Sequence, residues 1–233
     1  MNQDEMKVVV GRKAAESLVV DGMKIGLGTG STAIHVVKCV GDMLREGRLT
    51  NIRAVPTSYQ STIACEESGV PIYTLNSREI GGRLDLTIDG ADEVDAYHNC
   101  VKGGGGALLL EKIVAYASNS YAIVIDESKV AANLGMKFPV AIEVIPEARV
   151  SVTLALKKLH VEVLLRDAVR AAGPVVTECG NILLDIRFRT PVNPPALERE
   201  LNQIPGVVEN GFFTMLRPKL FIGHSDGTVE ICD

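Results

Sequence analysis

The stretch KIGLGTGST, residues 24–32, decides the fold of the first part of the chain. Residues 24–28 have the short apolar pattern of a buried strand, and a glycine turn then leads into an apolar-periodic helix that ends near Arg45. Such a turn exposes backbone N–H groups where the helix dipole is positive, so an anion can bind there. The stretch therefore predicts an anion-binding loop with hydroxyl donors from Ser31 and Thr32. The alternative is a tight turn capped by one of these hydroxyls.

This loop does not match two common nucleotide-binding motifs. Ser31 occupies the third glycine position of the dinucleotide fingerprint, and the Lys-Ser/Thr pair of a P-loop is missing. We therefore expect no nucleotide cofactor, and no cofactor of any other kind.

Strands alternate with helices over the first 134 residues, which implies parallel strands in a sheet covered on both faces. Strand–helix–strand then occurs twice, the ferredoxin-like order, and the last two strands are expected to return to the first sheet. The fold class is therefore α/β, with a Rossmann-like domain at 1–134 plus 209–233 and an inserted ferredoxin-like α+β domain at 135–208. The expected helices are 3–20, 33–45, 59–68, 107–117, 146–160 and 194–203. The expected strands are 24–28, 52–55, 84–88, 121–125, 140–145, 161–165, 182–188, 206–209, 219–222 and 228–231.

The composition of the 233 residues limits the possible partners and compartment. The net charge is −5 and no basic run occurs, which argues against a nucleic-acid or anionic-membrane partner. The five cysteines are widely spaced without a CxxC pair, so we expect no disulfide framework and a reducing compartment. The N-terminus is polar and acidic, unlike a signal peptide, and no apolar run reaches the ~20 residues that span a bilayer. We expect a cytoplasmic protein.

The stretch TIDGADE, residues 87–93, is the second chemical motif. Asp89 and Asp92 follow an apolar strand, and open α/β sheets bind ligands at the carboxyl ends of their strands. Two nearby carboxylates also differ in proton affinity, which suits acid–base chemistry. The alternative is a pair of aspartates that cap a turn. Glu93 and Asp95 are expected to be solvated.

The stretch KGGGG, residues 102–106, is the third motif. Consecutive glycines carry a large backbone-entropy cost. At the start of a helix they are best explained by N–H groups that must approach a ligand closely, with Lys102 supplying a positive charge. A flexible linker is the alternative.

Two further charged residues occupy informative positions. Glu111 lies one turn into the helix that follows the glycines, among leucines and an isoleucine that would make its carboxylate a stronger base by desolvation. Lys129 follows another predicted strand. Taken alone, each is better explained by an exposed surface position. Together with the glycine loops, they indicate a site for a phosphorylated substrate with acid–base chemistry.

These motifs, in this order, resemble the ribose-5-phosphate isomerase type A family over essentially the whole chain. They are Gln3-Asp4-Glu5 with Lys7, GTGST (28–32), DGADE (89–93), KGGGGAL (102–108) with Glu111-Lys112, and DESK (126–129), supported by FPVAIEVIP (138–146) and IPGVVENGFF (204–213). The sequence departs from the family at 177–179, where Thr-Glu-Cys stands in place of an expected Asp-Asn pair, and in the apolar run that precedes Glu111.

The resemblance implies a Rossmann-like domain with an inserted ferredoxin-like domain, a homodimer, and the conversion of D-ribose 5-phosphate to D-ribulose 5-phosphate through a cis-enediol in the non-oxidative pentose phosphate pathway. It implies that Glu111 is the general base and that Asp89, Asp92 and Lys102 assist it. The implied substrate-binding residues are Lys7, Thr29, Gly30, Ser31, Thr32, Asp89, Gly90, Ala91, Asp92, Lys102, Gly103, Gly104, Gly105 and Lys129.

No metal is expected, because His35, His98, His160 and His224 are dispersed without the spacing of metal ligands. Two other classes of protein remain alternatives. One is a non-catalytic sugar-phosphate sensor, although the chain has no basic helix for DNA binding. The other is an amino-sugar isomerase or a CoA transferase of similar architecture, and a transferase would form an acyl-glutamate.

Overall fold

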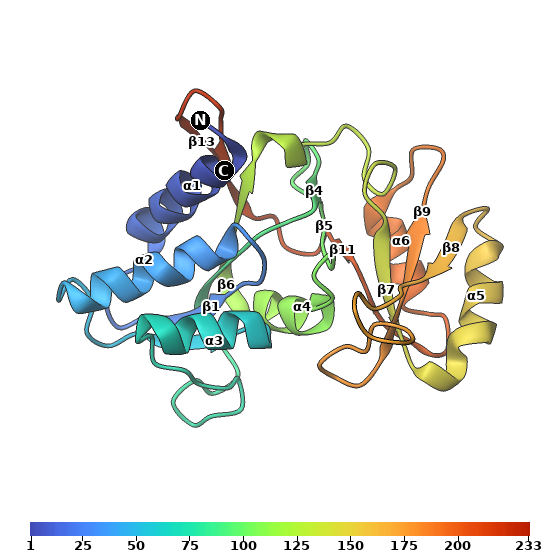
Figure 1. Ribbon diagram of the computed structural model, residues 1–233, viewed down its shortest axis with the longest axis horizontal. Helices are drawn as coiled ribbons and strands as arrows, with labels where there is room; N and C mark the ends of the chain where they lie inside the picture. Colours follow the sequence, from blue (N-terminus) through green and yellow to red (C-terminus); the bar gives the residue numbers. More distant parts are fainter. The chain divides into compact units, whose positions relative to one another are not determined.

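A computed structural model describes residues 1–233 (Figure 1). The chain forms two compact units. The first contains Met1–Gly90, Leu110–Lys129 and Leu216–Asp233, and the second contains Ala91–Leu109 and Val130–Met215. The domain boundaries expected from the sequence remain a prediction. Packing assigns residues 91–109, which include the glycine loop, to the second unit.

A six-stranded sheet forms the centre of the first unit, in the order β13-β12-β6-β3-β1-β2. All neighbouring strands are parallel except β13, which pairs antiparallel with β12 at the edge. This confirms the predicted α/β class and the return of the last two strands to the first sheet. The strands are β1 (Lys24–Leu27), β2 (Arg53–Pro56), β3 (Leu84–Asp89), β6 (Ser118–Asp126), β12 (Lys219–Gly223) and β13 (Val229–Cys232).

Helices cover both faces of this sheet. Side chains of α1 (Gln3–Leu18), α2 (Ala33–Arg45) and α3 (Tyr59–Ser68) pack with Ile25 and Leu27 of β1 in one large core. On the other face, a Cβ at Gly26 would lie 2.0 Å from Thr87 Oγ1 and 2.5 Å from Cγ1 of Val114, which belongs to α4 (Leu108–Tyr116). Only glycine therefore allows α4 to approach β1 so closely.

The order of the strands places a ligand site in the first unit. Chain connections leave β1 toward β2 on one side, and β3 lies on its other side. Such a switch point opens a crevice at the carboxyl ends of the two strands. The loop of residues 28–32 and Asp89 both lie at these ends.

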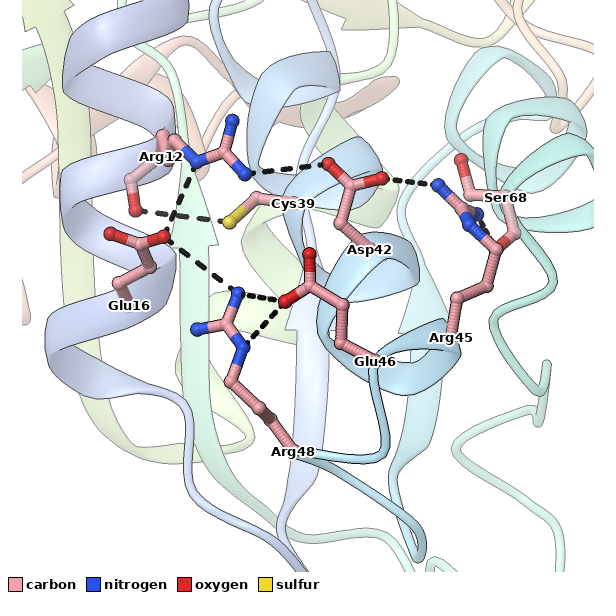
Figure 2. A network of polar contacts seen from close by, with 8 residues as sticks. All are labelled: Arg12, Glu16, Cys39, Asp42, Arg45, Glu46, Arg48 and Ser68. Carbon is pink, nitrogen blue, oxygen red and sulfur yellow. Dashed lines mark hydrogen bonds and ion pairs between the residues drawn. The ribbon is translucent and has the colours of Figure 1, made fainter.

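Close packing fixes α1 against α2. A Cβ at Gly11 would lie 2.8 Å from His35 Cβ, so glycine allows the two backbones to meet. Farther along both helices, an ion-pair network joins them (Figure 2). Arg12 Nη2 lies 3.7 Å from Asp42 Oδ2, and Arg48 Nη2 lies 3.9 Å from Glu16 Oε1. Residue numbers rise together along these contacts, so the helices run in the same general direction. The other members of the network are Cys39, Arg45, Glu46 and Ser68.

An antiparallel sheet in the order β10-β7-β9-β8 organises the second unit. In chain order, these strands and two helices follow the β-α-β-β-α-β sequence of a ferredoxin-like fold, which confirms the predicted insert. The elements are β7 (Val140–Val144), η2 (Pro146–Ala148), α5 (Arg149–Lys157), β8 (Glu162–Leu165), β9 (Ile182–Arg187), α6 (Pro194–Leu201) and β10 (Val207–Asn210).

A small sheet in the second unit was not expected from the sequence. Its strands, in the order β11-β5-β4, are β11 (Phe212–Phe213), β5 (Cys100–Val101) and β4 (Glu93–Val94). Strands of two residues are too short to show the period-2 pattern from which strands are predicted. Lys102 and the glycine loop continue directly from β5.

All five cysteines are free thiols, and Cys65 is fully buried, so that desolvation raises its pKa to about 12. Cys179 is exposed and Cys232 is half-buried. No group of three His, Cys, Asp or Glu side chains is arranged to hold a metal ion. None of the helices is both long enough and apolar enough to cross a membrane.

Candidate functional site

The loop after β1 delivers a helix N-terminus whose hydroxyls are not used for capping. Thr32 is the residue before α2, and its side chain makes no capping hydrogen bond. Ser31 is exposed, and Gly30 adopts a φ of 107°, which favours glycine. The alternative interpretation, a turn capped by Ser31 or Thr32, is therefore wrong for Thr32. This helix start has the positive potential that binds anions.

Asp89 at the end of β3 holds this loop. Its side chain is fully buried, and Oδ1 accepts hydrogen bonds from the N–H groups of Thr29 (3.0 Å) and Gly90 (2.7 Å). Gly28 lies against the same carboxylate, where a Cβ would be 2.0 Å from Oδ1. Asp89 is therefore both a buried carboxylate at the switch point and the residue that fixes the path of the loop of residues 28–32.

Two residues that the sequence reasoning missed also hold this loop. Thr29 Oγ1 donates to Ser58 Oγ at 2.6 Å, and Gly30 N–H donates to Gln60 Oε1 at 2.9 Å. Both partners follow β2, at the same carboxyl edge of the sheet. Their position after a predicted strand was the available signal. Thr29 thus supports the loop with its own hydroxyl and N–H.

Lys7 lies near the start of α2. It is one helical turn before Gly11 on α1, and Gly11 packs against His35 in the first turn of α2. Burial, and then the positive charges of Lys38 and Lys7, lower the pKa of His35. The ammonium of Lys7 is 3.1 Å from the exposed carboxylate of Asp4. Lys7 therefore places a positive charge near His35, in the first turn of α2.

Glu111 and Lys112 lie in the first half of α4, and both are buried, with 4% of each residue exposed. The alternative of an exposed Glu-Lys pair is therefore wrong. The first half of α4 therefore holds the side chain of Glu111 away from solvent.

Lys129 ends the short helix η1 (Glu127–Lys129), directly after β6. Burial acts to raise the pKa of Asp126, the last residue of β6, but hydrogen bonds from Ser128 and Gln3 hold it below its usual value. The positive charge of Lys129 also lowers the pKa of Asp126. Lys129 is half-buried, at the same edge of the sheet as the loop of residues 28–32.

The turn between β12 and β13 contacts η1 through hydrogen bonds to Glu127. Nδ1 and Nε2 of His224 lie 2.8 Å from Glu127 Oε2 and 3.1 Å from Glu230 Oε2, and these hydrogen bonds raise the pKa of His224. The charge of His224 also contributes to lowering the pKa of Asp226 in the same turn. The N-terminal ammonium donates to the carbonyl of Ser225 at 2.6 Å.

The glycine loop of the second unit is closely held. Gly103 and Gly106 have φ values of 101° and 83°, and the N–H of Gly104 donates to Asp92 Oδ2 at 2.8 Å. A Cβ at Gly104 would lie 2.6 Å from the other oxygen of that carboxylate. The loop is therefore an ordered structure, and the linker alternative is wrong. Ala91 precedes Asp92, and Gly105 is exposed beside Gly104.

Lys102 is anchored at the start of this loop. Its residue is 2% exposed, its N–H donates to the carbonyl of Gly211 at 2.9 Å, and its ammonium lies 5.5 Å from the centre of the Phe213 ring. A Cβ at Gly211 would lie only 2.4 Å from the carbonyl oxygen of Lys102. A buried ammonium held in this way has a defined position from which to meet negative charge.

Two expectations about acidic residues were wrong. Glu93 is 2% exposed, and its carboxylate accepts hydrogen bonds from the N–H groups of Gly135 (2.7 Å) and Phe138 (2.8 Å). Asp95 is 9% exposed and accepts from the N–H groups of Tyr97 and Asn99 at 2.9 Å. Both residues stabilise loops of the second unit, because the backbone donors there need acceptors away from water.

The first unit is an α/β fold with a helix start that has no side-chain cap and with two buried acidic residues, Asp89 and Glu111, and the second unit carries an ordered glycine loop that follows a buried lysine. Comparison with known proteins gives the family. The family model of ribose 5-phosphate isomerase A (phosphoriboisomerase A) matches residues 53–227. The chain belongs to the ribose 5-phosphate isomerase A family.

Relatives and solved structures of ribose 5-phosphate isomerases match this chain over nearly its whole length. The ribose-5-phosphate isomerase A of Treponema denticola is 52% identical over 93% of this chain and 91% of its own length. The protein of that name from Treponema pallidum is 48% identical over 96% and 91%. The structure of ribose 5-phosphate isomerase A from Methanocaldococcus jannaschii matches with a TM-score of 0.91, 39% identity and 97% coverage of both chains. A D-ribose-5-phosphate isomerase in complex with phospho-erythronic acid matches with a TM-score of 0.95, 38% identity and complete coverage of both chains.

Proposed function

We propose that this chain interconverts D-ribose 5-phosphate and D-ribulose 5-phosphate, as an aldose–ketose isomerase of the non-oxidative pentose phosphate pathway. Family membership supports the substrate. The observation that carries the chemistry is the burial of Glu111, one turn after an ordered glycine loop. A desolvated carboxylate at this point is suited to accept a proton from carbon.

Glu111 is the general base in this proposal. It removes the proton from C2 of the open-chain aldose and returns it to C1, through a cis-enediol. One carboxylate serves both carbons because they are adjacent. The developing negative charge on the enediol oxygens needs donors, and Lys102 with the N–H groups of the glycine loop supplies them. Each such donor lowers a barrier of this kind by roughly 3–4 kcal/mol.

Asp89 and Asp92 have separate tasks. Asp89, buried and at the switch point, moves protons on substrate oxygen, including the opening of the furanose ring. Asp92 holds substrate hydroxyls. One of its carboxylate oxygens also accepts a hydrogen bond from the N–H of Gly104. Asp92 therefore orders the glycine loop, which binds the same substrate.

The phosphate is bound by the start of α2 and by lysines. Ser31 and Thr32 donate their hydroxyls, and the N–H groups after Gly30 add the helix dipole. Lys7 contributes charge from α1, and Lys129 contributes charge from η1. Binding energy from this remote dianion positions the reacting carbons.

The remaining parts of the proposal concern partners and chemistry without a metal. We propose that the enzyme works as a cytoplasmic homodimer without a metal or cofactor. The absence of paired cysteines supports the compartment, and family expectation supports the dimer. The alternatives, a non-catalytic sensor and a CoA transferase or amino-sugar isomerase, are not favoured by the comparisons.

A coupled assay tests this function. Purified protein is given ribose 5-phosphate, ribose as the control without phosphate, and each again after treatment with EDTA. We expect ribulose 5-phosphate to form only from the phosphorylated sugar and at the same rate in EDTA. No product would refute the function, and loss of activity in EDTA would refute the metal-free chemistry. An acyl-glutamate detected by mass spectrometry after incubation with acyl-CoA would instead support the transferase.

A further inference from the structure

The guanidinium of Arg166 donates hydrogen bonds to the glycine loop. Its Nη1 donates to the carbonyl oxygens of Gly103 at 2.8 Å and Gly104 at 3.2 Å. On its other edge, Nε lies 2.8 Å from Asp185 Oδ2, and Nη2 lies 2.5 Å from Asp185 Oδ1. The side chains of Arg166 and Asp185 are 16% and 18% exposed. All of these residues belong to the second unit.

Regular backbone structure fixes both members of this pair. Asp185 lies in β9, opposite Leu164 of β8, and Arg166 directly follows β8. The N–H of Arg166 donates to the carbonyl of Leu183 at 3.0 Å, and its own carbonyl accepts from Val175 N–H at 2.8 Å. A bidentate pair between guanidinium and carboxylate also restricts rotation of the arginine side chain. Arg166 is thus a rigid donor rather than a mobile surface residue.

The two carbonyl contacts determine where N–H groups of the loop point. All peptide bonds in the chain are trans, so the C=O and the next N–H of each peptide point in opposite directions. The carbonyl of Gly103 faces Arg166, and the N–H of Gly104 accordingly points away, to Asp92 Oδ2. By the same geometry, the carbonyl of Gly104 directs the N–H of Gly105 away from Arg166. Gly105 is exposed.

We propose that Arg166, held by Asp185, is a positioning residue for the isomerisation, because it aims the N–H of Gly105 at the enediolate oxygens. The N–H of Gly104 donates to Asp92 and the N–H of Gly106 donates to the carbonyl of Gly103 at 3.0 Å, so we assign the exposed Gly105 as the N–H donor to the substrate. The cationic contact on the carbonyl of Gly104 also polarises that peptide, which strengthens its N–H as a donor. This inference rests on the proposed function and adds a residue that does not itself touch the substrate.

Lysine cannot replace arginine here. Arg166 uses one edge for Asp185 and the opposite nitrogen for two carbonyls, a planar arrangement that a compact ammonium does not reproduce. Arg166→Lys therefore keeps the charge but loses the direction of the loop. Arg166→Met removes both. Arg187→Met, which removes an exposed guanidinium on β9, is the matched control.

The test compares ligands that do and do not engage the loop. For each variant, kcat and KM are measured for ribose 5-phosphate, together with inhibition constants for inorganic phosphate and 4-phosphoerythronate, whose carboxylate imitates the enediolate. Arg166→Lys and Arg166→Met should lower kcat by about 10- to 100-fold, with KM changed by less than about threefold. The inhibition constant of phosphoerythronate should rise by about the same factor as kcat/KM falls, while that of phosphate stays constant.

Other results would overturn the proposal. If Arg166→Lys keeps wild-type kcat, or if both inhibition constants rise together with a fall in melting temperature, Arg166 is only structural. Asp185→Asn provides a second variant should Arg166→Met fail to fold, and it should show the same selective loss for phosphoerythronate. The Glu111→Gln variant distinguishes a failure of the proposed function from a failure of the positioning role of Arg166. If it stays active, the proposed base is wrong, whereas an inactive Glu111→Gln beside an unaffected Arg166→Lys refutes the positioning role alone.

Discussion

Replacement of Gly28 by alanine should disable the anion-binding loop through Asp89. The added Cβ would lie 2.0 Å from Asp89 Oδ1 and 2.5 Å from its Cα, whereas ordinary contact begins at 3.4 Å. One group must therefore move by about 1.4 Å, and the backbone on both sides belongs to a buried parallel sheet. The displaced carboxylate then loses the N–H donors of Thr29 and Gly90.

The magnitude follows from these contacts. Overpacking costs about 1–3 kcal/mol, and each hydrogen bond to a charged group contributes about 1.5–3 kcal/mol. Partial relaxation keeps the expected loss of unfolding free energy at about 2–4 kcal/mol, or a fall in melting temperature of roughly 5–15 °C. Displacement of Asp89 by about 1 Å should also lower kcat by about 100-fold.

The assay is calorimetry with steady-state kinetics, and the matched control is Gly90→Ala. A Cβ at Gly90 would meet only the carbonyl oxygens of Thr29 at 3.6 Å and Val124 at 3.8 Å, which are ordinary contacts. Its melting temperature should stay within about 2 °C of wild type. The reasoning is refuted if Gly28→Ala melts and turns over like wild type, or if Gly90→Ala is destabilised as strongly.

Two further predictions follow from the charges of the first unit. Lys7→Met should raise KM for ribose 5-phosphate by about tenfold with little change in kcat, because the proposed function assigns its charge to the remote phosphate. Lys13→Met, on the exposed side of α1, should leave both constants unchanged, and a loss confined to kcat would move Lys7 into the chemistry. His224 has a raised pKa in the folded state, so its contribution to stability is complete below its unfolded value of about 6.5 and disappears as the pH rises through the folded pKa. The melting temperatures of wild type and His224→Gln should therefore differ most near pH 6 and converge at higher pH, and a difference that grows with pH would show that the contacts with Glu127 and Glu230 are not ionic.

Much of the fold could be predicted because the signals are local. The glycine turn at residues 28–30, bounded by a strand and a helix, predicted the first unit, and Pro146 and Pro194 indicated the helix starts of the second. The small sheet was missed because pairing between two-residue strands depends on long-range contacts. The burial of Glu93 was missed for the same reason. Its hydrogen-bond partners, Gly135 and Phe138, are more than 40 residues away in the chain.

The residues of the candidate site also divide into those with a local signal in the sequence and those placed by long-range contacts. Asp89 and Glu111 could be selected because one follows a predicted strand and the other lies in the first turns of a predicted helix, and Lys102 could be selected because it opens the glycine run. Not every residue that holds these motifs could be selected in this way. Arg166 follows an ordinary-looking strand, and only the antiparallel pairing of β8 with β9 brings it to Asp185 and to the carbonyls of the glycine loop.

The most direct test of the central claim follows the proton carried by Glu111. Wild type and Glu111→Gln are incubated with ribose 5-phosphate in D₂O, and NMR records deuterium at C1 and C2 together with product formation. The variant should lose turnover and exchange by about 1,000-fold, while its inhibition constant for inorganic phosphate stays within about twofold of wild type. If Glu111→Gln still exchanges deuterium at more than about a tenth of the wild-type rate, the base is another residue and the account of this site is wrong.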